Sequence, residues 1–267
     1  MNFVTLFGRL HPRLRAFFFK YWYQILPRIS RQADWKFMNY GYEELTDQEQ
    51  VPQLAPEDEQ NRLFIQLYHH VANSIDLRGA NLLEVGCGRG GGADYVMRYL
   101  QPESLVGVDF SESVIKLCRQ MYDLEGLTFE SGNAESLPFP VNQFDVVINV
   151  ESSHCYGSVE NFFAEAWRVL RSGGHFLLAD FRRSKALDQL KEGLEKPGFQ
   201  LIRETDITPN ILQALRSGQR DRNAFVSEAI PGPLSRLAHQ FAGTPGSKIF
   251  ERFSTGETRY LSFVLKK

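Results

Sequence analysis

The chain has 267 residues, of which 43% are hydrophobic and 23% charged, and its formal net charge is −2. These values are typical of a soluble globular protein, and the length favours one α/β domain. The lack of a basic surplus argues against nucleic acid as the main partner. No apolar stretch reaches the roughly 18 residues of a membrane span. The three cysteines form neither a CxxC pair nor a metal-ligand spacing, so we expect a cytoplasmic protein without a metal.

The first 36 residues differ from this average. Seven basic residues stand there against one acid, Asp34, and aromatic residues lie between the basic ones over residues 14–26. Two interpretations stay open: a helix that lies on a membrane surface or holds a greasy substrate, and a helix that packs on the main domain. We therefore divide the chain into an N-terminal helical segment and lid, residues 1–56, and a main domain, residues 57–267.

The main domain begins with alternating helices and strands. Residues 57–75 have helical spacing, with Leu63, Leu67 and Val71 four residues apart. Further helices are expected at 93–100, 112–122 and 161–170, and strands at 81–86, 104–109, 127–130, 144–150 and 175–180. The almost entirely apolar strand 144–150 is typical of a parallel sheet covered on both faces. This order predicts an open, doubly wound, mostly parallel sheet that binds its ligand at the carboxyl ends of the strands.

Two more strands, at 198–206 and 258–265, bring the expected sheet to seven. Between them, residues 207–250 contain helical pieces interrupted by prolines. An insertion between two late strands of such a sheet lies over the ligand end. It is either a substrate cap or a structural flap, and both interpretations stay open.

The strongest motif is the glycine turn Gly86-Cys87-Gly88-Arg89-Gly90-Gly91, which follows the first strand, while Asp109 ends the second. Glycines let a ligand approach the backbone and the carboxylate binds ribose hydroxyls, so the unit indicates a nucleoside site. Taken alone, it fits an NAD-dependent oxidoreductase. Three features favour another nucleoside: Glu84 inside the first strand, the polar turn at 132–139, and the later blocks at 144–147 and 169–174.

This ordered set of blocks resembles the class I S-adenosylmethionine-dependent methyltransferases over roughly residues 60–183. The resemblance implies a Rossmann-like fold and S-adenosylmethionine as cofactor, with S-adenosylhomocysteine as its product. It assigns the methionine portion to Glu84, Gly86, Gly88 and Gly90, the ribose to Asp109, and the adenine to Phe110, Asn133 and Ala134, with the backbone of Asn149 closing the site. The family commonly has Asp where Asn133 stands, and an amide oxygen still accepts a hydrogen bond there.

Transfer to a neutral hydroxyl also needs a general base, and histidine titrates in the right range. His154 follows the fourth strand and Asp180 ends the fifth, so both are expected at one edge of the sheet. An Asp beside a His fixes its tautomer and stabilises the imidazolium. We therefore assign His154 as base and Asp180 as the residue that orients it. Natural-product O-methyltransferases that resemble this chain place His and Asp in the same two blocks.

Four blocks resemble the phthiotriol/phenolphthiotriol dimycocerosate methyltransferases, which O-methylate a hydroxyl of a polyketide lipid. They are residues 20–23, 39–44, 115–118 and 151–156. The resemblance implies that Tyr40 and Tyr42 belong to a lid, adds Tyr156 to the substrate side, and makes a hydrophobic hydroxylated small molecule the expected substrate. His69 and His70 are not assigned to the site.

Three alternatives stay open. The first is C-methylation of a sterol, quinone or polyketide. The other two are a non-catalytic cofactor-binding module and the NAD-dependent oxidoreductase.

Overall fold

The computed structural model describes residues 36–46, 51–220, 222 and 243–267. The predicted basic, aromatic helix therefore lies outside the described residues, as does much of the predicted insertion. Residues 36–46 are extended and contain no helix, although the sequence assigned them to a helical segment and lid.

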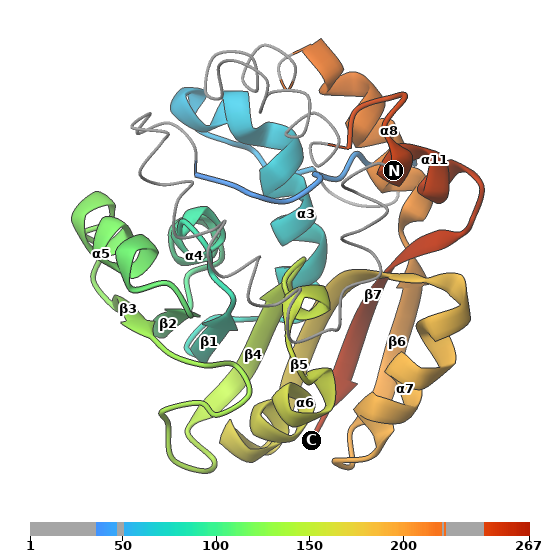
Figure 1. The fold of residues 1–267 in the computed structure, drawn as a ribbon. Coiled ribbons are helices and arrows are strands. Elements are labelled where there is room, and N and C mark those ends of the chain that lie inside the picture. Colours follow the sequence, from blue (N-terminus) through green and yellow to red (C-terminus); the bar gives the residue numbers. More distant parts are fainter. Residues whose placement is uncertain (1–35, 47–50, 221, 223–242) are drawn as a thin grey trace.

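A seven-stranded sheet in the order β3-β2-β1-β4-β5-β7-β6 forms the centre of the domain (Figure 1). Strands β1 to β5 pair in parallel, while β7 runs antiparallel to both β5 and β6. The prediction of an open, mostly parallel sheet is confirmed. The strands are β1 (Asn81–Val85), β2 (Ser104–Asp109), β3 (Leu127–Ser131), β4 (Phe144–Val150), β5 (Leu170–Arg183), β6 (Gln200–Asp206) and β7 (Thr258–Lys266).

Strand β5 is longer than predicted. Leu170 pairs with Phe144 ahead of an irregularity in β4, so the strand already includes Ser172 and the glycines at 173 and 174. These glycines resemble a helix-ending turn in the sequence, but in the structure they form an irregular part of the strand, between the pairs Phe144–Leu170 and Val146–His175. At its other end the strand continues past Asp180 to Arg183, because β7 pairs with it as far as Thr258.

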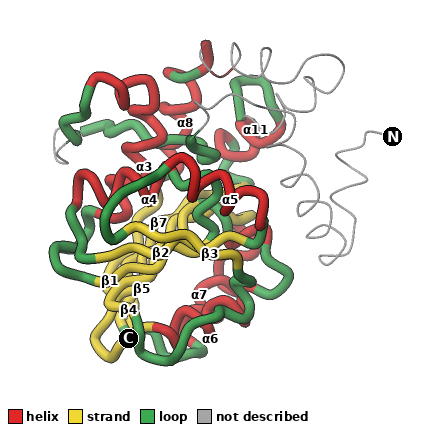
Figure 2. Tube along the Cα trace, turned by 90° about the vertical axis from the view of Figure 1, so that its left-hand side faces the viewer, coloured by secondary structure: helices red, strands yellow, loops and turns green. Residues whose placement is uncertain are grey.

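Helices cover both faces of the sheet (Figures 1 and 2). The side chains of β1 alternate accordingly: Leu82 belongs to the core under α3, α4 and α5, and Leu83 to the core under α6 and α7. The predicted helix 57–75 is divided into a 3-10 turn that starts at Pro56 and the helix α3. The helical elements around the sheet are η1 (Pro56–Asn61), α3 (Arg62–Ala72), α4 (Gly91–Tyr95), the π-helical turn η2 (Val96–Leu100), α5 (Glu112–Met121), α6 (Val159–Val169) and α7 (Leu187–Glu195).

The insertion between β6 and β7 is present as predicted. Its described helices, α8 (Thr208–Ser217) and α11 (Lys248–Ser254), pack on each other and on β7. They lie beyond the carboxyl ends of the parallel strands, at the top of Figure 1. None of the helices in the described part of the chain has the length and apolarity to cross a membrane.

A matched pair of helical glycines tests the packing between neighbouring helices. A Cβ on Gly92 in α4 would lie 2.0 Å from the Tyr68 ring, whereas one on Gly193 in α7 would meet Phe163 at an ordinary 3.5 Å. We expect Gly92→Ala to lower the free energy of unfolding by about 1–3 kcal/mol through overpacking. Gly193→Ala should leave it unchanged or raise it by up to about 1 kcal/mol. Urea unfolding measures both, and equal effects would contradict this account of the packing.

Candidate functional site

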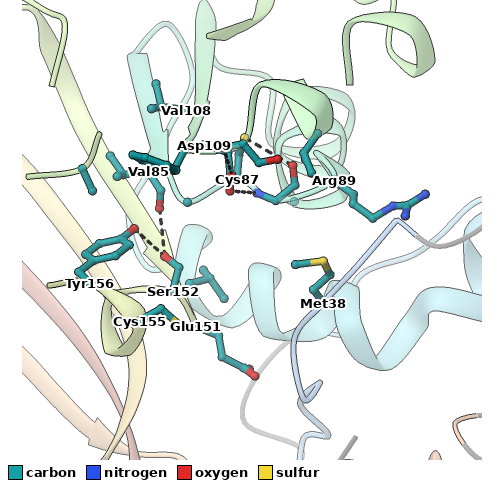
Figure 3. A pocket seen from close by; sticks show the side chains of 18 of the residues that line it. Met38, Val85, Cys87, Arg89, Val108, Asp109, Glu151, Ser152, Cys155 and Tyr156 are labelled. Carbon is teal, nitrogen blue, oxygen red and sulfur yellow. Dashed lines mark hydrogen bonds between the residues drawn. The ribbon is translucent and has the colours of Figure 1, made fainter. Parts of the chain in front are cut away.

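A cavity of about 420 Å³ opens at the carboxyl ends of β1, β2 and β4 (Figure 3). Small-molecule sites commonly have roughly 300–1,000 Å³. The walls come from loops after these strands and from residues 36–39, which precede the main domain. The cavity is lined by Lys36, Phe37, Met38, Asn39, Tyr68, Val85, Gly86, Cys87, Gly88, Arg89, Gly92, Val108, Asp109, Phe110, Ser111, Val114, Gly132, Asn133, Ala134, Glu135, Val150, Glu151, Ser152, Cys155, Tyr156 and Gly157.

Two of the three predicted glycines line this cavity. Gly86 has φ +79°, and a Cβ there would lie 2.2 Å from the Ser152 hydroxyl. Gly88 has φ +51°, and the nearest atom to a Cβ there is the Met38 methyl, 3.6 Å away across the cavity. Gly90 is not among the lining residues. Its φ of +80° begins α4, and a side chain there would meet Tyr122 and Phe129, so in this structure it serves the turn and the packing.

Glu84 is 2% exposed and faces α3, as the alternation of β1 requires. It is not among the residues that line the cavity, although its partner Tyr68 is. Its Oε1 accepts a hydrogen bond of 2.8 Å from the Tyr68 hydroxyl, while Oε2 is buried with no hydrogen-bond partner among the described residues. Burial raises the pKa of Glu84, the Tyr68 hydrogen bond opposes this rise, and Asp109 adds to it, giving about 7. An unpaired buried carboxylate oxygen fits an ammonium donor, which is the group that the methyltransferase resemblance assigns to it.

Asp109 lies at the end of β2 and lines the cavity. Its two oxygens accept hydrogen bonds from the backbone N–H groups of Gly88, at 3.2 Å, and Ser111, at 2.9 Å. These bonds orient the carboxylate beside the glycine turn. Burial raises the pKa of Asp109 in spite of the backbone donors. A carboxylate held in this way has further lone pairs for two ribose hydroxyls.

The predicted adenine end also borders the cavity. Phe110 is 49% exposed at its edge, and Asn133 and Ala134 form part of the wall. The Asn133 Oδ1 accepts a hydrogen bond of 3.0 Å from the Glu135 N–H, which fixes the turn. An amide oxygen with two lone pairs can take a second donor from a ligand.

Asn149 lies outside the cavity wall, contrary to the expectation that its backbone closes the site. It is fully buried, and its amide donates to the Val85 carbonyl, the Ser152 hydroxyl and the Tyr156 hydroxyl at 2.7–3.1 Å. These bonds join the ends of β1 and β4. Asn149 therefore supports Ser152 and Tyr156, which do line the cavity.

His154 and Asp180 meet as expected from the topology. His154 belongs to the short turn η3 (Ser153–Cys155), and its Nδ1 lies 2.8 Å from the Asp180 Oδ1. Asp180 is 1% exposed, also accepts from the Ser153 hydroxyl and from the N–H groups of His154 and Phe181, and forms an ion pair with Arg182. Because an ionised carboxylate only accepts, His154 Nδ1 is the donor and Nε2 is left for other chemistry.

The charges of this pair are coupled. Burial opposes ionisation of Asp180, but His154 and Arg182 outweigh it and lower its pKa. Burial likewise lowers the pKa of His154, while the Cys155 sulfur and the Asp180 carboxylate raise it, to about 10. Both shifts favour the ion pair of an imidazolium with an aspartate. Neither residue lines the cavity itself, although Glu151 and Cys155, on either side of His154, do so.

An aromatic cluster packs over this pair. It consists of Tyr40, Phe181, Phe253 and Tyr260, with ring centroids 5.6–6.4 Å apart, and the His154 ring lies 4.3 Å from Phe181. Tyr40, expected in a lid near the cofactor, belongs to this cluster rather than to the cavity wall.

Tyr42, the second tyrosine expected in a lid, is also absent from the wall. It is buried and stacks on His70, while His69 pairs with the Tyr95 hydroxyl. The two histidines of α3 thus contact other side chains of the protein, and neither was assigned to the site.

Several lining residues were not predicted. Tyr68 is one residue of a helical repeat, and nothing in the sequence separates it from a core residue. Glu151 carries a signal, since it is an acid placed directly after an apolar strand. No group of three or more metal-ligating side chains occurs within the described ranges.

The chain is similar in sequence to known methyltransferases. The family model described as a methyltransferase domain matches residues 83–178. The chain is 36% identical over 248 residues to the phthiotriol/phenolphthiotriol dimycocerosates methyltransferase of Mycobacterium leprae, covering 93% of this chain and 91% of that protein. It is 34% identical over 245 residues to the fatty-acid O-methyltransferase of Mycolicibacterium smegmatis, with 92% and 88% covered.

Among solved structures, the cyclase SpnF is similar with a TM-score of 0.69 and 20% identity. The match covers 93% of this chain and 94% of that chain. A likeness at this identity shows the fold alone.

The Asp109 carboxylate gives a direct test of the cavity. We expect Asp109→Asn to weaken binding of S-adenosylhomocysteine about ten- to hundredfold, because hydrogen bonds to a charged group contribute roughly 1.5–3 kcal/mol. Glu103→Gln, an exposed change at the opposite end of β2, serves as the control. Isothermal titration calorimetry measures both, and unchanged affinity in Asp109→Asn would show that the ribose lies elsewhere.

Proposed function

The chain belongs to the family of the phthiotriol/phenolphthiotriol dimycocerosates methyltransferases, within the class I S-adenosylmethionine-dependent methyltransferases, and we propose that it methylates a hydroxyl oxygen of a hydrophobic lipid or polyketide. The observation that carries the proposal is the His154–Asp180 pair, which stands beside the cavity under an aromatic cluster.

The residues of the cavity fit the cofactor. Glu84 would take the amino group, Gly86 and Gly88 the methionine portion, Asp109 the ribose, and Phe110 with Asn133 and Ala134 the adenine. When bound, S-adenosylmethionine supplies an electrophilic methyl group on a sulfonium. Support comes from the unpaired Glu84 Oε2 and from the oriented Asp109 carboxylate.

The His154–Asp180 pair provides the base that a hydroxyl acceptor needs. Asp180 holds Nδ1 of the ring, so Nε2 receives the proton once the imidazole is neutral. Because the pKa of His154 is about 10, the ring must first lose a proton. A second positive charge in the neighbouring cavity favours that loss.

The class of acceptor follows from the surroundings of the pair. The half-buried Phe181 ring lies 4.3 Å from His154, and the half-buried Tyr40 ring packs on Phe181. Phe253 and Tyr260 are buried behind them, and aromatic surface of this kind suits an apolar chain. The names of the two relatives, a dimycocerosates methyltransferase and a fatty-acid O-methyltransferase, support a lipid acceptor.

The test of the proposed function is transfer of isotopically labelled methyl to a panel of a long-chain alcohol, an alkyl phenol and a fatty acid. We expect a methyl ether from a hydroxylated lipid. His154→Ala should lower hydroxyl methylation by about 10²- to 10⁴-fold, the usual contribution of a general base. Methylation of a fatty acid needs no base because its carboxylate is already ionised, so that reaction is the internal control. Label on carbon in the products would instead establish C-methylation.

The pH dependence separates the roles of the two residues. In the wild type kcat/KM should rise with pH towards about 10, because only neutral His154 accepts a proton. Asp180→Asn should lower the maximal rate. It should also move the rising limb of the pH profile towards about 6.5, the ordinary pKa of histidine. Binding of S-adenosylhomocysteine, which should stay within a few-fold, reports whether the variant folds. A limb unmoved in Asp180→Asn would remove the base assignment.

We also propose that residues 1–36 bring the enzyme to the cytoplasmic surface of a membrane, since their basic and aromatic composition suits anionic headgroups. Three free cysteines fit a reducing compartment. Liposomes containing anionic lipid should sediment the full chain and should retain far less of a chain lacking residues 1–35. Equal sedimentation would mean that the segment packs on the domain. Adding salt should release the bound protein, because screening weakens the attraction.

A further inference from the structure

Glu151 has an unusual backbone conformation directly after β4. Its φ is +50°, in the left-handed region that residues other than glycine seldom occupy, and its N–H donates 2.8 Å to the Ala179 carbonyl. Such strain persists only where the surroundings enforce it, and it is common at functional sites. Here it turns the side chain at the point where the chain leaves the sheet and enters the wall of the cavity.

Glu151 is half-buried and its carboxylate has partners on two other segments. Its Oε2 accepts 2.8 Å from the Tyr40 N–H and 3.1 Å from the Tyr260 hydroxyl. Residues 36–40, here called the strap, line the cavity up to Asn39 and then reach Glu151 through Tyr40. The Tyr40 carbonyl in turn accepts a hydrogen bond from Arg222 of the insertion. Glu151 therefore joins the cavity, the strap and the last strand.

The position of Glu151 places it between donor and acceptor. It lines the cavity together with Gly86 and Asp109, and it is three residues from His154. In Figure 3, Glu151, Cys155 and Met38 lie on the opposite side of the cavity from Asp109 and Cys87. Bound with its ribose at Asp109 and its methyl group towards His154, the cofactor would have its sulfonium on the Glu151 side of the cavity.

The charges around Glu151 do not already neutralise it. Tyr68 on α3, Tyr260 on β7, Tyr40 in the strap and Asp180 on β5 surround it, and the cationic groups facing it are His154 and, from the insertion, Arg222. Burial raises the pKa of Glu151, and the Tyr40 N–H and His154 only partly oppose this, leaving about 8. A cation entering the cavity therefore meets a carboxyl group that can still lose a proton.

We propose that Glu151 is the residue through which the site distinguishes the positively charged methyl donor from its neutral demethylated product. S-adenosylmethionine and S-adenosylhomocysteine share the ammonium group, the ribose and the adenine, so Glu84 and Asp109 bind both alike. Only a carboxylate close to the sulfur distinguishes them. Loss of the methyl group removes the positive charge from the ligand. Glu151 then takes up a proton, so it attracts the ligand less strongly and release of the demethylated product is favoured.

The experiment compares the two ligands by isothermal titration calorimetry on the full chain, without acceptor. In the wild type, S-adenosylmethionine should bind more tightly as the pH rises from about 6 to about 9, and measurements in buffers of different ionisation enthalpy should show more proton release with it than with S-adenosylhomocysteine. Glu151→Gln keeps a hydrogen-bond acceptor for the Tyr40 N–H. It should weaken S-adenosylmethionine about tenfold or more and abolish the difference in proton release, while S-adenosylhomocysteine binding changes little.

A matched control removes a different acid from the same cavity. Glu135 lines the predicted adenine end, where its carboxylate accepts from the Gly157 N–H. Glu135→Gln should alter both affinities by the same factor, so their ratio stays that of the wild type. Retained binding of S-adenosylhomocysteine also shows that each variant is folded.

Two outcomes would overturn the proposal. One is an equal loss of affinity for both ligands in Glu151→Gln, which would make Glu151 a structural support of the strap. The other is the same proton release for both ligands in the wild type. Neither outcome depends on the acceptor, because the inference rests on the sulfonium cofactor and not on the proposed hydroxyl substrate.

Discussion

The arrangement of the chain around His154 depends on one buried carboxylate. Asp180 is 1% exposed, and four neighbouring residues supply it with hydrogen bonds or charge: Ser153, His154, Phe181 and Arg182. Burying a charge is costly unless it is paired and fully hydrogen-bonded, and Asp180 meets both conditions. The same bonds fix the turn after β4 against the end of β5. The orientation of His154 and the path of the chain past Glu151 both follow from them.

The acids in and around the site differ in how far neighbouring groups compensate their charge. Asp180 is compensated inside the protein, and its pKa lies below the ordinary value. Glu84 and Glu151 are not fully compensated, and their pKa values are raised to about 7 and about 8. The difference follows from the partners, since Asp180 has a cation and several donors, whereas the Glu84 Oε2 has no partner among the described residues. The charge of Asp180 is thus compensated within the protein, whereas Glu84, behind the cavity wall, and Glu151, in the wall, are left less compensated.

Much of this arrangement could be predicted from the sequence, because it depends on local patterns. The glycine turn, Asp109 after β2 and the apolar β4 locate the cavity, and parallel topology brings His154 to Asp180. Contacts between distant segments could not be predicted. The strap contacts Glu151, which is 111 residues from Tyr40 in the sequence, and Tyr68 of α3 contacts Glu84 of β1. Gly90 and Asn149 were assigned to the cofactor from the resemblance, yet the structure places both behind the wall, where packing and hydrogen bonding explain them.

The reversed direction of β7 divides the molecule into two halves with different freedom to change. The loops after β1, β2 and β3 build the donor half, and their register is fixed by parallel neighbours on both sides of β1 and β2. The insertion leaves the sheet at β6 and returns on its neighbour β7, so its length can vary without shifting any strand, at a small cost in loop entropy. The insertion can therefore be lengthened or shortened while the loops that line the cavity keep their positions.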